Sequence, residues 1–110
     1  VECYDFKAKS WSYIAPMQSK RYGVAACVHG EKLCAVGGHE GSGSALKTVE
    51  CYDFQAKSWS YIAPMQSKRG YVAACVHGEK LHAVGGFDGS GSALNTVECY
   101  DFKAKSWSYI

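Results

Sequence analysis

The segment RGYVAACVHGEKLHAVGGFDGSGSALNTVECYDFKAKSWSYI, residues 69–110, decides the fold of this chain. It opens with a short apolar run at residues 71–76, and the His77-Gly78 dipeptide after it suits a two-residue turn with positive φ. A second apolar run at residues 81–84 ends at Gly85-Gly86, and a loop rich in turn-forming residues follows. This half of the segment predicts two short strands joined by a tight turn.

Two further stretches of alternating residues complete the segment. Residues 96–100 and 106–110 alternate as strands do, and a short polar connection joins them. Nothing in the segment has the spacing of a convincing helix. The segment therefore predicts an all-β fold, in which four short strands form one antiparallel sheet. The chain's two prolines, Pro16 and Pro64, follow the fourth strand, where a missing N–H donor does no harm.

The segment recurs along the chain with a period of 48 residues. Residues 1–48 and 49–96 match at 41 of 48 positions, and residues 97–110 repeat residues 1–14 without a change. A fixed period of this length is typical of stacked supersecondary units. Features present once per unit are therefore expected to be architectural, and the seven differing positions are the place to look for individual function.

The predicted sheet is apolar on both faces. Val72, Ala74 and Val76 point to one face, and Ala73 and Cys75 point to the other. Such a sheet needs a neighbouring sheet against each face, and radial repetition around an axis supplies both. The coarse prediction is a β-propeller built of four-stranded antiparallel blades.

The repeat count predicts about two and a half blades. A partial blade, made of the third and fourth strands, is expected at residues 1–14, and complete blades are expected at residues 21–62 and 69–110. The chain opens at Val1, and both of its ends fall inside the repeated pattern. We expect it to be a fragment of a longer polypeptide, with exposed sheet edges and apolar faces that make the isolated fragment self-associate.

Composition narrows the possible partners. The 110 residues carry 12 lysines and arginines against 10 acidic residues, and no basic run exceeds two residues. Binding to nucleic acid or to a membrane surface therefore has no electrostatic support. There is no apolar stretch of membrane-spanning length and no signal-peptide pattern.

All six cysteines are predicted to be reduced. Like cysteines recur in the same position of successive units, too far apart for a bridge within the fold. Cys34 alone has no counterpart, because the second unit has His82 there. We expect buried thiols in a cytoplasmic protein, in preference to a disulfide framework. The cysteines that share one position are Cys3, Cys51 and Cys99, and those that share another are Cys27 and Cys75.

No metal, cofactor or catalytic site is predicted. Residues 41–48 end like a phosphate-binding loop, but Leu46 stands where the second glycine is required, and a strand follows where a helix is required. The cysteines and histidines between residues 27 and 39 lack the tight spacing of structural zinc. Every plausible pairing of a serine or cysteine with a histidine recurs in the second unit or is broken there, unlike a catalytic constellation.

The unit resembles a kelch repeat, and the resemblance covers the whole chain. The family has a diglycine at the end of the second strand, then a Tyr and a Trp at a set spacing, and its metazoan kelch-like members add a Met-x-x-x-Arg connection and a Thr-Val-Glu-x-Tyr-Asp strand. The chain departs from the pattern where an aromatic residue usually precedes Val-Gly-Gly. The matching residues are Gly37 and Gly38, Gly85 and Gly86, the pairs Tyr4/Trp11, Tyr52/Trp59 and Tyr100/Trp107, Met17–Arg21, Met65–Arg69, Thr48–Asp53, Thr96–Asp101 and Asp88-Gly89. The departures are Cys34 and His82 at that aromatic position, and His39-Glu40 in place of Phe87-Asp88.

The motif residues have an architectural interpretation. The diglycines are expected to serve close approach of neighbouring sheets or unusual φ angles. The tryptophans recur in every unit and are expected to be core anchors between blades.

A partner-binding rim is predicted on one face of the blades. In a four-stranded antiparallel blade, the second-to-third and fourth-to-first connections emerge on the same face, and six of the seven differing positions lie in or beside them. Neutral drift after duplication is the alternative explanation. The rim candidates are Arg21, Tyr22, His39 and Glu40 in the first unit, and Arg69, Tyr71, Phe87, Asp88 and Asn95 in the second.

Two details of the rim stay open from the sequence. The arginines are present in both units and have a structural alternative, which is to bond the carbonyls of a neighbouring blade. Tyr22-Gly23 in one unit contrasts with Gly70-Tyr71 in the other, and a shift of one place along a strand turns an aromatic ring to the opposite face. One tyrosine is therefore expected at the channel mouth and the other elsewhere.

The resemblance implies a protein-interaction module without enzymatic activity. The leading hypothesis is the substrate-recognition propeller of a kelch-like (BTB-kelch) adaptor for a cullin-RING ubiquitin ligase, which binds a peptide segment of its substrate. The alternatives are an actin-binding cytoskeletal scaffold and, less favoured, an enzyme built on a kelch propeller.

Overall fold

Each repeat folds as a meander of short antiparallel strands. The computed structural model describes all residues from Val1 to Ile110 and contains ten strands and no helix. It therefore has no helix that could cross a membrane. The all-β prediction is confirmed. The first hairpin consists of β1 (Glu2–Asp5) and β2 (Ser10–Tyr13). The next sheet consists of β3 (Ala25–His29), β4 (Lys32–Val36), β5 (Val49–Asp53) and β6 (Ser58–Ile62). The last sheet consists of β7 (Ala73–His77), β8 (Lys80–Val84), β9 (Val97–Asp101) and β10 (Ser106–Tyr109).

Both four-stranded sheets keep their strands in chain order. The orders are β3-β4-β5-β6 and β7-β8-β9-β10, and every neighbouring pair is antiparallel. We call them blade 1 and blade 2. Aspartates set the turn after the third strand, since Asp53 Oδ1 accepts hydrogen bonds from the backbone N–H of Gln55 at 2.8 Å and Ala56 at 3.2 Å. The hydrogen bond from Ala56 makes the largest contribution to lowering the pKa of Asp53, and the bond from Gln55 makes the next largest.

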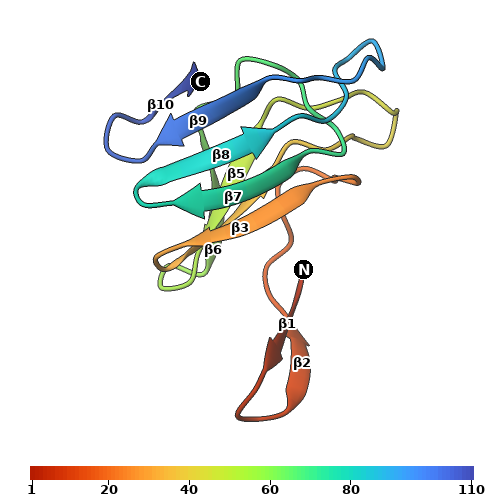
Figure 1. Ribbon diagram of the computed structural model, residues 1–110. Coiled ribbons are helices and arrows are strands. Elements are labelled where there is room, and N and C mark those ends of the chain that lie inside the picture. Colours follow the sequence, from red (N-terminus) through yellow and green to blue (C-terminus); the bar gives the residue numbers. More distant parts are fainter.

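The core lies between the two blades. Blade 1 contributes Val36 and Val49, blade 2 contributes Leu81 and Tyr100, and Met65 of the connecting segment packs between them. Figure 1 shows β3 and β7 running beside each other, while the β1–β2 hairpin extends away from the rest of the chain. Each sheet therefore uses a neighbour to cover an apolar face, as a blade of a β-propeller does.

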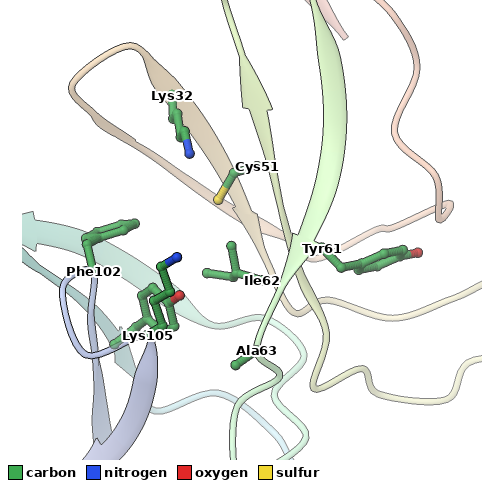
Figure 2. A pocket seen from close by; sticks show the side chains of 8 residues that line it. Lys32, Cys51, Tyr61, Ile62, Ala63, Phe102 and Lys105 are labelled. Carbon is green, nitrogen blue, oxygen red and sulfur yellow. The ribbon is translucent and has the colours of Figure 1, made fainter. Parts of the chain in front are cut away.

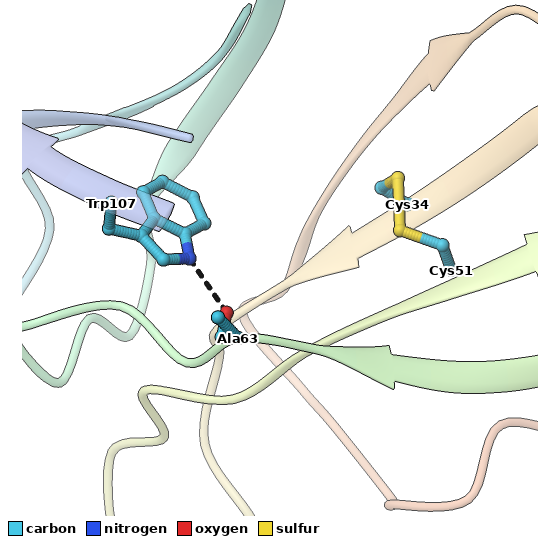
Figure 3. Close-up of a disulfide and its surroundings, with 4 residues drawn as sticks. All are labelled: Cys34, Cys51, Ala63 and Trp107. Carbon is cyan, nitrogen blue, oxygen red and sulfur yellow. Dashed lines mark hydrogen bonds between the residues drawn. A yellow bond between two sulfur atoms is a disulfide. The ribbon is translucent and has the colours of Figure 1, made fainter. Parts of the chain in front are cut away.

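The tryptophans anchor each outer hairpin to the segment before it. The indole N–H of Trp107 donates to the carbonyl of Ala63 at 2.7 Å (Figure 3). The indole N–H of Trp59 donates to the carbonyl of Ala15, also at 2.7 Å. Both indoles are 7% exposed. Trp11 occupies the same place in the β1–β2 hairpin, but it is 64% exposed and its indole makes no such hydrogen bond.

The structure contradicts the prediction that all six cysteines are reduced. Cys34 and Cys51 form a disulfide that joins β4 to β5 (Figure 3). They stand directly opposite each other in the strand register, with Cα atoms 4.1 Å apart. The prediction compared only cysteines in the same position of different units, whereas Cys34 and Cys51 stand at two different positions of one blade. Blade 2 has His82 opposite Cys99 and so has no equivalent bridge.

The other four cysteines are free thiols. Cys27 lies opposite Cys34 in the register of β3 and β4. Burial, with a smaller contribution from Cys75, raises the pKa of the Cys27 thiol to about 11. Cys27 therefore stays protonated at neutral pH, and this disfavours its attack on the adjacent disulfide.

Candidate functional site

The two predicted rim arginines are buried structural groups. The Arg69 side chain is fully buried and donates from Nε to Glu98 Oε2 at 3.0 Å. Its Nη1 donates to the carbonyls of Gly85 and Thr96, both at 2.9 Å. Arg21 makes the same set of contacts in blade 1, where its side chain is also fully buried. Neither guanidinium has a surface to offer a partner, so the placement of Arg21 and Arg69 on an accessible rim is wrong.

The structural alternative for the arginines holds, with one difference. The carbonyls that each arginine binds belong to its own blade rather than to a neighbour. The link to the neighbouring blade comes from the Arg69 backbone instead. Its carbonyl accepts from the N–H of Gly38 at 2.8 Å, and its N–H donates to the carbonyl of Leu46 at 3.0 Å.

The diglycines allow backbones to approach closely, across the blade boundary at Gly37 and within blade 2 at Gly86. A Cβ on Gly37 would lie 2.3 Å from the Arg69 carbonyl oxygen, and a Cβ on Gly86 would lie 2.6 Å from the Gly70 oxygen. Gly37 and Gly86 also have positive φ angles, of 60° and 96°. Any larger residue there would push the connecting segment off the blade.

An aromatic cluster spans the two blades beside these segments. It consists of Tyr22, His39, Tyr71 and Phe87, and we call it the aromatic rim. The rings of Tyr22 and His39 stack with centroids 5.2 Å apart, and the Tyr71 ring lies 5.2 Å from His39 and 6.3 Å from Phe87. The contacts form a chain of rings from the first blade to the second.

Two glycines make the cluster possible. A Cβ on Gly70 would lie 1.7 Å from Cε1 of His39, so the imidazole occupies space that any other residue would fill. A Cβ on Gly23 would lie 3.1 Å from Cδ1 of Tyr71, so this ring rests on the Gly23 backbone. Tyr71 also donates its N–H to the Gly23 carbonyl at 2.8 Å. Each blade thus supplies a glycine where the other supplies a ring.

The two tyrosines point to the same cluster, contrary to the interpretation that one of them is aimed elsewhere. The rings of Tyr22 and Tyr71 meet edge to face, with centroids 6.4 Å apart. Both residues lie outside the regular strands, and Tyr71 and its counterpart Gly23 have φ angles of 49° and 61°. The side-chain alternation of a strand does not apply to a backbone in this left-handed conformation.

The acidic rim candidates bond mainly within their own loops. Asp88 Oδ1 accepts from the hydroxyl of Ser90 at 2.7 Å and from the N–H groups of Ser90 and Ser92, and these bonds lower the pKa of Asp88. Glu40 accepts from the Ser42 hydroxyl at 2.8 Å. Asn95 is exposed. No group of three His, Cys, Asp or Glu side chains is arranged to hold a metal ion.

Sequence reasoning missed the coupling between the differing positions. The contrast of Tyr22-Gly23 with Gly70-Tyr71 was interpreted as a shift of one ring along a strand, separate from the His39/Phe87 difference. The structure instead brings these positions into contact across the blade boundary. The signal was present in the sequence. A tyrosine and a glycine exchange places between the units, so each unit keeps one aromatic ring and one position without a side chain.

Comparison with known proteins gives the chain its family. The profile described as the KLHDC2/KLHL20/DRC7 Kelch-repeats domain matches residues 1–110. Human Kelch-like protein 4 is 51% identical over 41 residues, and mouse Kelch-like protein 1 is 44% identical over 41 residues. In each case the match covers 37% of this chain and 6% of the relative, so the chain spans only a small part of either protein.

The fold and the sequence match agree. The residues that the profile covers contain four-stranded antiparallel blades, diglycines packed against backbone carbonyls, and a tryptophan anchored to the preceding segment. Kelch-repeat domains are typically interaction modules without enzymatic activity, and this chain belongs to the kelch-repeat family, as a run of kelch blades of a β-propeller.

Proposed function

We propose that this chain binds a short segment of a partner protein at the aromatic rim. The observation that carries the proposal is the exposure of three rings at one place: Tyr71 is 61% exposed, Tyr22 is 47% exposed and Phe87 is 42% exposed. Tyrosine supplies a large, stiff contact area at low cost in side-chain entropy, which is why it is enriched at the centre of binding interfaces.

The backbone of Tyr71 adds support. A tyrosine at a φ of 49° costs about 1–3 kcal/mol, and such strain collects at functional sites. A glycine stands at the same position of the first blade, so the fold itself does not need a side chain there. In this proposal, Tyr71 is kept because its ring faces the partner.

The proposed biological setting is substrate recognition for a cullin-RING ubiquitin ligase. It rests on the family match and on the resemblance to kelch-like adaptors, whose propellers present substrate segments to the ligase. The protein that contains this chain is then expected to co-purify with a cullin.

Tyr71→Ala is the central test, with Tyr13→Ala as its matched control, because Tyr13 is 80% exposed in the β1–β2 hairpin, outside the rim. A random peptide library is selected on the wild-type chain, and the selected peptides are titrated against both variants. Y71A should weaken binding at least tenfold, Y13A should leave it within twofold, and neither should shift the melting temperature greatly. Equal losses in both variants, or no selected peptide, would exclude a rim-specific site.

Two further measurements separate the proposed settings. In the ligase setting, Y71A in the longer protein should abolish ubiquitylation of the bound partner while cullin co-purification persists. Co-sedimentation with actin filaments that Y71A leaves unchanged would instead favour a cytoskeletal role.

A further inference from the structure

A second site lies between the blades, on residues other than those of the aromatic rim. A cavity of about 370 Å³ extends there from the start of β4 and the β9–β10 turn to the end of β6. Blade 1 and the segment after it supply Lys32, Ile62 and Ala63 to its wall. Blade 2 supplies Tyr100, Phe102 and Lys105. The volume is within the usual range of small-molecule sites.

The cavity has a fixed aromatic wall. The Phe102 ring is stacked on the imidazole of His29, with centroids 3.9 Å apart and planes within 3°, and it meets the Tyr100 ring edge to face at 5.1 Å. His29 is itself held by Glu79, 2.8 Å from its Nε2. Phe102 is therefore held in place before any ligand arrives, so little ordering is needed on binding.

The charges on the cavity are all positive. Lys32 and Lys105 reach toward the same space from opposite blades (Figure 2), and no acidic residue lines the cavity. Neither lysine takes part in any of the chain's three ion pairs. Asp53 stands opposite Lys32 in the register. Its carboxylate accepts the backbone N–H groups of its own turn, and the charge of Lys32 makes a smaller contribution to lowering the pKa of Asp53.

We propose that this cavity binds a small aromatic acid, a carboxylate or sulfonate with one negative charge on a flat ring system. The ring packs on Phe102 and Ile62, and the anionic group lies between the ammonium groups of Lys32 and Lys105. The site is independent of the proposed function, since none of its residues belongs to the aromatic rim.

The probe is 1-anilinonaphthalene-8-sulfonate, with N-phenyl-1-naphthylamine, the same ring system without the sulfonate, as its neutral control. Binding of each is titrated by fluorescence against the 110-residue chain. The test variants are Lys32→Gln and Lys105→Gln, which remove the charge and keep a polar side chain.

The repeat supplies a matched control for each variant. Lys80 and Lys57 occupy the repeat positions of Lys32 and Lys105, and Lys57 shares the positive φ of Lys105, but neither lines the cavity. Each test variant should weaken sulfonate binding about fivefold, as loss of a partly exposed ion pair does. Lys80→Gln and Lys57→Gln should leave it within twofold, and no variant should change binding of the neutral control.

Two outcomes would overturn the proposal. Equal weakening by all four variants would show a general response to net charge, and sulfonate binding unchanged in every variant would place the probe on the exposed apolar faces of the sheets. As an independent readout, 1-naphthoate should displace the sulfonate probe from the wild-type chain and displace it less well from Lys32→Gln.

Discussion

Gly70→Ala tests whether the aromatic rim is built on the gap at Gly70. The new Cβ would lie 1.7 Å from Cε1, 2.2 Å from Nδ1 and 2.4 Å from Nε2 of His39, so the whole imidazole must leave. His39 is only 9% exposed, and its ring packs on Tyr22 and on Tyr71. Gly70 has no positive φ, so alanine adds no backbone strain of its own and the steric effect is isolated.

The expected cost is about 1–3 kcal/mol, the usual penalty for overpacking a well-filled site. His39→Ala alone should also destabilise, because it leaves a hole over Gly70. In the double variant the alanine methyl group partly fills that hole. The two changes should therefore be less harmful together than their sum, with a coupling energy of about 0.5–3 kcal/mol.

Urea unfolding followed by tryptophan fluorescence measures all four corners of this cycle. Gly41→Ala is the control, since Gly41 also lacks a positive φ and a Cβ there would meet nothing within 4 Å. Alanine at Gly41 should change the free energy of unfolding by less than about 1 kcal/mol, in the stabilising direction. A Gly70→Ala variant as mild as this control, or a double variant with no rescue, would refute the role of the gap.

Four further predictions concern the rest of the chain. Trp107→Ala should cost about 3–5 kcal/mol in urea unfolding, whereas Trp11→Ala should cost far less, because Trp11 is 64% exposed; equal costs would contradict the packing. Thiol counting of the unfolded, unreduced protein should find four free thiols, and six thiols would exclude the Cys34–Cys51 bridge. Cys34→Ser should lower the free energy of unfolding by about 3 kcal/mol, as expected for a closed loop of this length. Backbone hydrogen bonds from Lys103 and Ala104 lower the pKa of Asp101. The stability that this carboxylate contributes is therefore present above pH 3.8 and is lost as the pH falls below it. The wild-type chain should then lose more stability than Asp101→Asn between about pH 5 and pH 2. The 110-residue polypeptide should self-associate in light scattering across a concentration series, since Trp11 and one apolar face of each blade lack a neighbour, and a monodisperse monomer of about 12.0 kDa would contradict this.

The sequence was sufficient to predict the fold because the fold depends on features that repeat. Strand alternation, the turn dipeptides and the diglycines occur in every unit, so each prediction was supported more than once along the chain. The antiparallel order of β7 to β10 follows from the quoted segment alone.

The predictions for the two arginines and for Cys34 and Cys51 were wrong because each depends on contacts between different positions of one blade. Arg69 is at one end of a blade in the sequence, but its long side chain reaches inward to a buried carboxylate at Glu98. Cys34 and Cys51 become neighbours only through the exact register of β4 and β5. A period describes which positions are equivalent, and it does not say which unlike positions touch.

The contacts among the differing positions also bear on the alternative of neutral drift. Independent loop changes after a duplication would be scattered with respect to one another. Here the His39 ring fills the space over Gly70, and the Tyr71 ring covers Gly23. A side chain at Gly70 would clash with His39, and one at Gly23 would crowd Tyr71, so these differences between the blades are linked by packing. Positions linked in this way change together, which changes that arise independently in separate loops would not do.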